Sequence, residues 1–334
     1  MKKIYTYILA LVALNATLSK AQSLSYDYVR NNPFDIKNLT FSIDPFFVDV
    51  NGHNGYSFGW GARAEGMFGK RLLLNYDVRT GFGTNHYRKS NDNTRNYFAM
   101  EGGIGLILSN KMKSKNLRIV LSESTSGNVK TTTTVRGGVP AKTRLIIALR
   151  GGFAQYTNTL DYKNLNDSIL TFNGTPYKTA QTNGMFTDSS DIQRIKPIDQ
   201  YGGIAMMTLY GGFQFRRIWD LVVDVSGYGQ RSNVRFSDFY IDVMFAPVIG
   251  IKNFENTDGR KYDVKYDAKS HFGYRLGWYF RKPKDQGFSF KFELGSKPGF
   301  KAEKDKYVNP KNLYGMLTFG LYIPLKVKPF YEGE

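Results

Sequence analysis

Cysteine is absent from the 334 residues, and histidine occurs only three times. Without cysteine the chain has no disulfide, no thiolate metal ligand and no cysteine nucleophile. The mean hydropathy of −0.39 excludes a membrane protein built from several apolar helices. The chemistry that remains must come from hydroxyl, carboxylate and basic side chains.

Motifs for catalysis or metal binding are also lacking. His53 and His86 fall in predicted loops, and no histidine pair has the spacing of metal ligands. Ser270 precedes His271, but the strand register predicted below turns the imidazole into a lumen, away from a lipid substrate. We therefore expect no enzymatic activity, no metal and no cofactor.

Glycine and aromatic residues are abundant instead. The chain has 34 glycines, and phenylalanine, tyrosine and tryptophan make up 15% of it. With a low mean hydropathy, this composition is typical of transmembrane β-barrels, whose strands alternate apolar and polar residues. The formal charge of +18 indicates an anionic neighbour such as lipid headgroups or an acidic protein. Nucleic acid is not an expected partner, because the chain begins with an export signal.

Residues 1–21 have the pattern of a secretory signal peptide. Lys2 and Lys3 provide the positive charge, residues 4–18 are mostly apolar, and Ser-Lys-Ala at 19–21 is a small-x-small cleavage site. The apolar run is shorter than the roughly 20 residues of a membrane span. We therefore expect an exported mature chain.

Apolar and polar side chains alternate most clearly in residues 314–326. One face of this segment is wholly apolar and carries Leu317, Phe319, Leu321, Ile323 and Leu325. A period of two with one apolar face is typical of a strand whose outer side meets lipid. Residues 271–280 and 287–295 repeat the pattern, so three consecutive strands follow one rule.

Fourteen such segments predict an all-β fold, a single antiparallel up-and-down barrel over residues 39–327. The segments are 39–50, 56–69, 71–83, 97–109, 116–124, 128–136, 142–155, 202–215, 219–230, 235–245, 248–254, 271–280, 287–295 and 314–326. The count depends on two splits at turn residues, one at 126–128 and one at Ala246-Pro247. Twelve or sixteen strands would follow from a different split.

Fourteen strands put both termini in the periplasm and every long connection outside the cell, as in bacterial barrels. Those connections are 84–96, 156–201, 255–269 and 296–313. Residues 22–38 then form a periplasmic N-terminal segment, and residues 328–334 form a periplasmic tail. The alternative is an exported β-sandwich, but a sandwich seldom repeats large apolar faces across so many strands.

The predicted inner face carries nine basic and seven acidic residues. The basic residues are Arg63, Arg79, Arg118, Lys130, Arg136, Arg144, Arg150, Arg275 and Lys291. The acidic residues are Glu65, Asp77, Glu101, Asp224, Asp238, Asp242 and Glu293. A polar lumen with paired charges accounts for this near balance. The alternative is a selectivity device, in which basic and acidic strands face each other across a water-filled pore.

The excess of basic residues is concentrated at the predicted periplasmic turns and strand ends. This predicted rim consists of Lys70, Arg71, Lys111, Lys113, Lys115, Arg216, Arg217, Arg281, Lys282 and Lys284. Outer-membrane lipids, both phospholipid and lipopolysaccharide, are expected neighbours, and the rim suits phospholipid headgroups or an acidic periplasmic protein. Loop 156–201 carries many apolar residues, so we expect it to fold into the barrel mouth or to contact a partner.

These features together resemble outer-membrane β-barrel proteins of Bacteroidota. The resemblance depends on the Ser-Lys-Ala-Gln signal junction at 19–22, on the glycine-rich and aromatic strands over 39–327 and on the short basic turns. It implies an outer-membrane location. The chain is too short for the plug and barrel of a TonB-dependent transporter. Two functions remain open: a non-enzymatic subunit of an outer-membrane complex for secretion, protein assembly or surface display, and a porin-like channel. A surface adhesin is a third.

Overall fold

The computed structural model describes fifteen stretches of the chain. These are residues 24–34, 39–51, 55–69, 71–82, 97–161, 169–172, 175–177, 179–182, 185–188, 201–252, 254–255, 261–265, 269–282, 286–300 and 312–325. The predicted signal peptide (1–21) and tail (328–334) lie outside them. Within these stretches, no helix is long and apolar enough to cross a bilayer.

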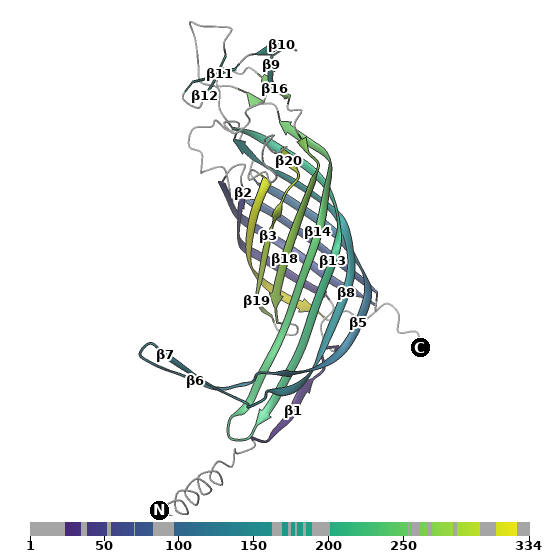
Figure 1. Cartoon of the computed structure of the whole chain (residues 1–334), viewed down its shortest axis with the longest axis vertical. Coiled ribbons are helices and arrows are strands. Elements are labelled where there is room, and N and C mark those ends of the chain that lie inside the picture. The colour runs from purple at the N-terminus through teal and green to yellow at the C-terminus, as the bar shows by residue number, and fades with distance from the viewer. Residues whose placement is uncertain are drawn as a thin grey trace, which may run out of the picture. The chain divides into compact units, whose positions relative to one another are not determined.

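Ten antiparallel strands close into a barrel (Figure 1). In chain order they are β2 (Leu39–Asn51), β3 (Gly55–Phe68), β4 (Leu72–Gly81), β5 (Phe98–Leu117), β8 (Val139–Asp161), β13 (Tyr201–Val225), β14 (Gly229–Lys252), β18 (Phe272–Arg281), β19 (Gly287–Ser296) and β21 (Leu313–Leu325). Closure comes from the pairing of β8 with β13 and of β2 with β21. The predicted all-β barrel is therefore confirmed.

The pairing register shows at which end of the barrel the connections lie. Leu39 at the start of β2 faces Leu325 at the end of β21, and the tight β3–β4 turn at Gly69 lies at this same end. Tyr201 at the start of β13 faces Asp161 at the end of β8, which places the longest connection at the opposite end. The longest connection thus lies at one end of the barrel, which we call the long-connection end, and the β3–β4 turn lies at the other, which we call the short-turn end.

The predicted number of fourteen strands is wrong for two physical reasons. First, β13 pairs with β8 without a break through Arg216 and Arg217, so the expected turn there does not exist. Second, β14 continues through Pro247, because its ladder with β18 ends at Phe245 and the missing proline N–H falls beyond that ladder. Four predicted segments therefore form two long strands.

The remaining two surplus segments form a hairpin that is not part of the barrel wall. β6 (Val120–Ser126) and β7 (Val129–Thr134) pair only with each other, in a two-stranded sheet of their own. Gly127 in the turn has a φ of +57°, a conformation that glycine adopts without steric cost. The predicted split at residues 126–128 is a real turn, but it separates hairpin strands.

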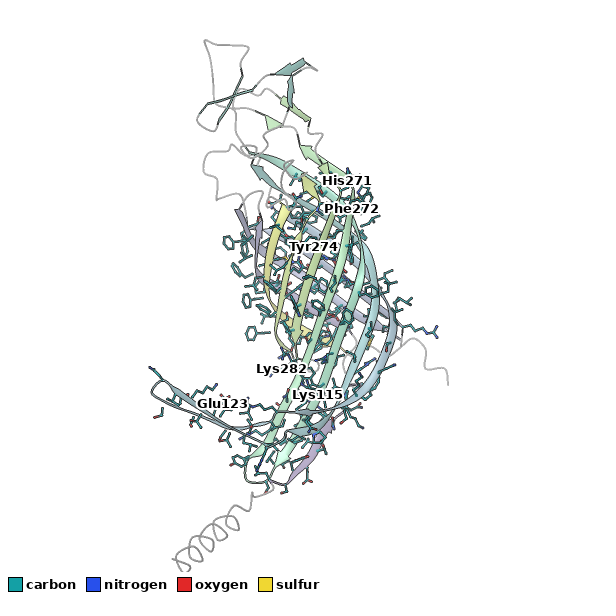
Figure 2. The ribbon with its side chains drawn as sticks, viewed as in Figure 1. Lys115, Glu123, His271, Phe272, Tyr274 and Lys282 are labelled. Carbon is teal, nitrogen blue, oxygen red and sulfur yellow. The ribbon has the colours of Figure 1, made fainter. Side chains whose placement is uncertain are left out.

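The outer wall of the barrel is apolar, as the alternation predicts. On β21, Phe319, Leu321 and Ile323 are exposed, whereas Gly320 and Tyr322 between them are buried. Figure 2 shows the same outward placement for Phe272 and Tyr274 of β18. Other exposed apolar side chains on the wall are Phe41, Ile43, Trp60, Ile104, Leu106, Leu108, Leu149, Phe153, Leu209, Phe213, Ile241, Val243 and Phe288. Exposed apolar residues on every side of a closed barrel are typical of a wall that faces lipid.

A second compact unit contains residues 24–31, 115–141 and 221–233 of the described chain. Within it, β1 (Tyr26–Asn31) pairs with the end of β13, over Leu221–Val225. Its core consists of Leu117, Ile119, Leu121, Val135, Val139, Ala141, Leu221, Val223 and Val225, all buried. Hydrogen bonds from side chains to the backbone also stabilise this unit. Arg231 donates to the carbonyl of Leu121, and the hydroxyl of Tyr28 donates to the carbonyl of Pro140. We call this unit the accessory unit.

Short strands occupy part of the predicted loop 156–201. β8 extends to Asp161, so the connection begins later than predicted. Four short strands follow: β9 (Ile169–Phe172), β10 (Thr175–Tyr177), β11 (Thr179–Thr182) and β12 (Met185–Asp188). β9 also pairs with β16 (Lys261–Lys265), which pairs with β15 (Phe254–Glu255), and β17 (Lys269–Ser270) pairs with β20 (Gly299–Phe300). The described part of this connection is therefore built from short antiparallel strands.

Candidate functional site

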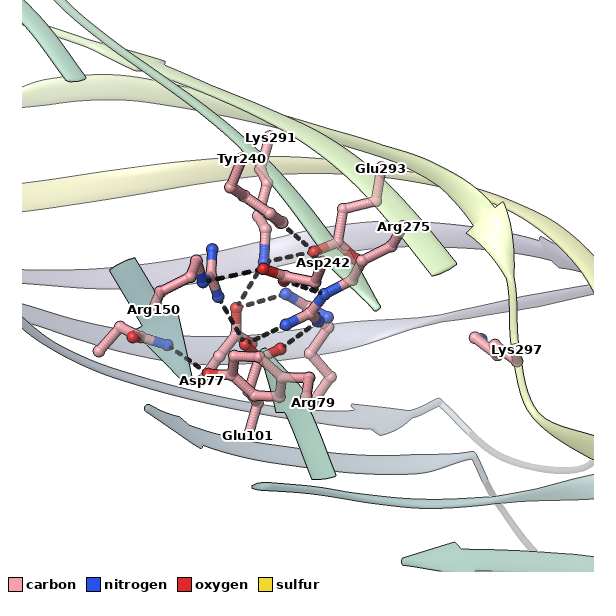
Figure 3. A network of polar contacts seen from close by, with 12 residues as sticks. Asp77, Arg79, Glu101, Arg150, Tyr240, Asp242, Arg275, Lys291, Glu293 and Lys297 are labelled. Atoms are coloured by element: carbon pink, nitrogen blue, oxygen red, sulfur yellow. Dashed lines mark hydrogen bonds and ion pairs between the residues drawn. The ribbon is translucent and has the colours of Figure 1, made fainter. Parts of the chain in front are cut away.

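Charged side chains cross the middle of the barrel lumen and pair with one another (Figure 3). Arg275 of β18 binds both carboxylate oxygens of Glu101 on β5, at 2.6 and 2.7 Å. Its Nε also donates to Asp242 of β14 at 2.7 Å. Arg150 of β8 donates to Glu101 at 3.1 Å and lies 3.4 Å from Asp242. Two arginines and two carboxylates from four strands thus form one closed ring of ion pairs.

A second group of charges is centred on Asp77 of β4. Its Oδ2 accepts from Arg63 at 3.2 Å, from Lys291 of β19 at 3.3 Å and from Arg79. Lys291 also lies 3.0 Å from Glu293, which accepts from the hydroxyl of Tyr240. Because β4 and β19 are not neighbours in the wall, the Lys291–Asp77 pair spans the lumen.

A third group joins β3, β13 and β14. Arg216 of β13 donates to Asp238 of β14 at 2.7 and 3.1 Å and pairs with Glu65 of β3. Gln214 donates to the same carboxylate oxygen at 2.5 Å. All these charged groups are buried, and burial of a charge is tolerated only when partners replace its water.

Aromatic rings fill the space between the ion pairs. The guanidinium of Arg150 lies 4.1 Å from the ring centre of Tyr240 and 5.1 Å from that of Tyr210. Tyr210 fits because the adjacent part of the wall, on β8 and β5, carries Gly152 and Gly103, where a Cβ would collide with its hydroxyl. Such cation–π contacts strengthen when water is excluded. The rings and charges together leave little of the lumen open.

Nearer the short-turn end a cluster of apolar side chains lies among the arginines of the lumen. Ile146, Ile218 and Phe236 have no exposed surface and pack with Tyr279 and the partly buried Met67. Arg281 lies 4.0 Å from the ring centre of Phe236. An inner face in a water-filled barrel is polar, so this apolar cluster keeps water from part of the inner face.

A small cavity remains on the other side of the charge network. Its volume is about 70 Å³, and it is lined by Arg79, Met206, Met244 and Met316, among others. Lys297, which follows β19, reaches its edge, and Figure 3 shows this side chain apart from the ion pairs. A second cavity, of about 50 Å³, lies among Arg63, Glu65 and Asp238. The first cavity is the one whose apolar wall could hold a small molecule.

The structure brings most of the predicted lumen residues together. The inward, buried group contains Arg63, Glu65, Asp77, Arg79, Glu101, Arg144, Arg150, Asp238, Asp242, Arg275, Lys291 and Glu293. The lumen prediction is wrong for Arg118, Lys130, Arg136 and Asp224, which are exposed residues of the accessory unit. They were misplaced because the hairpin and the end of β13 alternate like barrel strands without being part of the barrel wall.

The predicted basic rim is also only partly correct. Arg71, Lys111, Lys113, Lys115, Arg217 and Lys282 are exposed, whereas Arg216 and Arg281 are buried in the lumen. Arg216 lies on the inner face because β13 continues through it, and Arg281 ends β18 with its side chain inward. Lys70 and Lys284 lie outside the described residues.

Several residues of the site escaped the sequence analysis. Asp44 accepts from Arg63 at 3.0 Å, and Asp49 accepts from Lys297 at 2.6 Å, both as buried residues of β2. A signal was present: residues 40, 42, 44 and 49 are polar positions in an otherwise apolar strand. A register shift between Ile43 and Phe46 turns Asp49 inward although it lies at odd spacing from Asp44, and strict alternation cannot reveal such a shift.

No protein-family model matches the sequence, and no curated protein matches it. Among solved structures, OmpT, an outer membrane protein of Vibrio cholerae, is similar at 8% identity and a TM-score of 0.19, covering 89% of this chain and 100% of that chain. OpdQ of Pseudomonas aeruginosa is similar at 9% identity and a TM-score of 0.11, covering 86% and 98%. Scores this low give no guidance on function.

The geometry of the barrel itself defines the fold. It combines antiparallel closure with an outer wall that is apolar on all sides. In water, an apolar wall of this extent would aggregate, whereas in lipid it is the solvated surface. The fold is that of an outer-membrane β-barrel. Across the described residues, no group of three or more histidine, aspartate or glutamate side chains is arranged to hold a metal ion.

Proposed function

We propose that the protein is a non-enzymatic barrel subunit of a larger outer-membrane complex, acting in secretion, outer-membrane protein assembly or surface display. The observation that carries the proposal is the filled lumen. Charges that line a conducting pore face water and passing solute, but here they face one another in closed pairs. Transport through the centre does not account for such a lumen, whereas an anchoring role does.

The accessory unit supports the same role. Four barrel strands lengthen to contribute to it, and it has a core of its own. Its β6–β7 hairpin is exposed at every residue from Ser122 to Thr131, and an isolated two-stranded hairpin is only marginally stable in water. The hairpin adds nothing to the barrel wall or to the core. A partner that covers it would explain why the chain includes it.

We propose that this partner is an acidic protein. Within residues 115–141 the exposed charges are Lys115, Arg118, Lys130 and Arg136, against Glu123 alone. Complementary charge speeds docking and selects the partner. With both termini in the periplasm, the β5–β8 connection that contains the hairpin would be periplasmic as well.

Replacing the hairpin tests the proposal. Ser122 and Thr133 face each other across β6 and β7, so an Asn-Gly turn in place of residues 123–132 closes the shortened hairpin without strain. The buried residues Leu121 and Val135 stay in place. We expect the variant to insert in the membrane but to lose the proteins that travel with the wild type through mild detergent extraction and size exclusion.

Two controls separate the alternatives. Glu123→Lys should retain or strengthen co-purification, because the carboxylate that it removes opposes the proposed attraction. Binding of the wild type to anionic vesicles, with loss of that binding in the shortened variant, would identify lipid rather than protein as the partner. Steady conductance steps from wild-type barrels in a planar bilayer would favour the porin-like channel, for which the charged lumen is the supporting feature.

A further inference from the structure

Three tyrosines surround the ammonium group of Lys297 near the long-connection end of the lumen. The Lys297 Nζ lies 4.1 Å from the ring centre of Tyr156, 4.4 Å from that of Tyr314 and 5.9 Å from that of Tyr97. Among the described residues, its carboxylate partner is Asp49, at 2.6 Å. Aromatic faces around a cation, completed by a carboxylate, are the arrangement by which proteins recognise organic ammonium ions.

The walls of this cage do not depend on the lysine. Tyr97 packs against Phe47 with ring centres 4.9 Å apart and against Tyr156 with ring centres 5.5 Å apart. The hydroxyl of Tyr156 accepts from Asn158 at 2.6 Å. The walls come from β2, β8, β21 and the residue before β5, and all are buried. A site held in shape by its own contacts is preorganised for a ligand.

Lys297, in contrast, lies just beyond the last residue of a wall strand. It follows the end of β19, where its backbone N–H donates to the carbonyl of Asn312. Its side chain extends into the cage, and 14% of the side-chain surface stays exposed. The lysine therefore occupies the cage as a tethered ligand would.

The cavity described above adjoins the cage and shares its three tyrosines. Met206, Met244 and Met316 give it an apolar wall that suits a short hydrocarbon body. The charges support a cation as well. The cavity and cage together contain Asp49, Asp77, Glu101 and Glu293 against Arg79 and Arg275, so withdrawal of Lys297 leaves an excess of negative charge.

We propose that the cage of Tyr97, Tyr156, Tyr314 and Asp49 is a binding site for a small organic ammonium ion, which Lys297 fills in the absence of ligand. The ammonium of the ligand takes the place of the lysine Nζ, and its apolar body enters the methionine-lined cavity. This site is independent of the proposed partner surface, because cage residues belong to the barrel unit and the hairpin to the accessory unit.

The probe is n-butylammonium, which matches the lysine side chain in length and charge. In the wild type, the tethered lysine competes at a high effective concentration. We expect Lys297→Ala to bind n-butylammonium at least tenfold more tightly than the wild type, as measured by titration calorimetry on the folded protein in detergent. The neutral analogue n-butanol should show no saturable binding.

Two variants control for the source of the effect. Lys297→Ala combined with Asp49→Asn should lose the gain, because the cage then lacks its carboxylate. Lys130→Ala should not create binding, since Lys130 also pairs with a carboxylate, Glu123 at 2.8 Å, but has no aromatic cage.

The outcomes that overturn the proposal are equally specific. Equal affinity of the wild type and Lys297→Ala would refute it, and so would equal binding of n-butanol. If Lys297→Ala alone does not fold, n-butylammonium added during refolding should restore the heat-modifiable mobility of the barrel while n-butanol should not. Failure of that rescue would also refute the site. Loss of co-purification in the hairpin variant tests the partner proposal separately.

Discussion

Arg275 holds both carboxylate oxygens of Glu101 across the lumen, although the two residues are 174 positions apart in the chain. Their strands, β18 and β5, are not neighbours in the barrel wall. A two-point guanidinium–carboxylate contact fixes distance and orientation together, and it is the strongest form of ion pair. The pair therefore links two strands that are not neighbours and holds opposite parts of the barrel wall together.

Removing the negative charge of Glu101 from this ion pair should destabilise the barrel strongly. In Glu101→Gln the side chain keeps its shape, but Arg275 and Arg150 each lose a charged partner in a buried position. Breaking a buried pair on one side costs about 3–5 kcal/mol, because the remaining charge is left uncompensated. We expect a loss of this size in the free energy of unfolding, measured by urea titration in detergent or lipid.

The matched control is Glu123→Gln in the β6–β7 hairpin. Glu123 lies 2.8 Å from Lys130, but both side chains are about half exposed. Exposed pairs contribute about 0–1 kcal/mol. Equal destabilisation by the two substitutions would mean that the lumen pairs are hydrated as surface pairs are.

The fold could be predicted from the sequence because lipid imposes a local rule. Each residue on β21 must face either lipid or lumen, so the alternation of Leu321 and Tyr322 can be read without knowing what pairs with what. The same rule gave the inward direction of Glu101, Arg150 and Arg275. The number of barrel strands does not follow from this rule. Apolar and polar residues alternate in any strand with two different faces, whether or not the strand belongs to the barrel wall.

What the sequence could not provide is long-range information. Two adjacent arginines in the sequence suggest an exposed turn. Only the structure shows that Arg216 forms ion pairs with Glu65 and Asp238 in the lumen. The hairpin strands alternate like wall strands, although they pair only with each other. Likewise, Asp49 and Lys297 are 248 positions apart, and nothing in either neighbourhood indicates the other.

A charge on the lipid-facing wall should cost energy according to its depth. Leu321 lies in the middle of the outer face of β21, and Leu325 lies at the end of the strand. Arginine costs about 2–4 kcal/mol near the bilayer midplane and about 0–1 kcal/mol near the interface. We expect Leu321→Arg to impair assembly into lipid vesicles far more than Leu325→Arg, as followed by heat-modifiable mobility. Similar losses from both would contradict the assigned wall.

The packing of Tyr210 inside the barrel predicts a contrast between two adjacent glycines. A Cβ on Gly152 would lie 2.7 Å from both the Tyr210 hydroxyl and the Cα of Gly103. On the outward-facing Gly151, the nearest atom would be the Tyr210 carbonyl oxygen at 3.4 Å. Overpacking of this kind costs about 1–3 kcal/mol, so Gly152→Ala should be destabilising in urea titration and Gly151→Ala nearly neutral. The reverse order would mean that the register of β8 is wrong.

Two carboxylates of like charge face each other in the accessory unit. Asp27 of β1 is the direct cross-strand partner of Asp224 of β13, and both are exposed. Like charges directly opposite destabilise a sheet, whereas an opposite pair adds about 0.2–1 kcal/mol. Asp224→Lys should therefore hold β1 more firmly, and Asp224→Asn should give a smaller gain because it only removes the repulsion. Hydrogen exchange at the amide of Ser226, which donates to the carbonyl of Ser25 beside this pair, measures the strength of the pairing. Protection of this amide should be highest in Asp224→Lys, lower in Asp224→Asn and lowest in the wild type. An unchanged exchange rate in both variants would mean that β1 does not pair with β13 in solution.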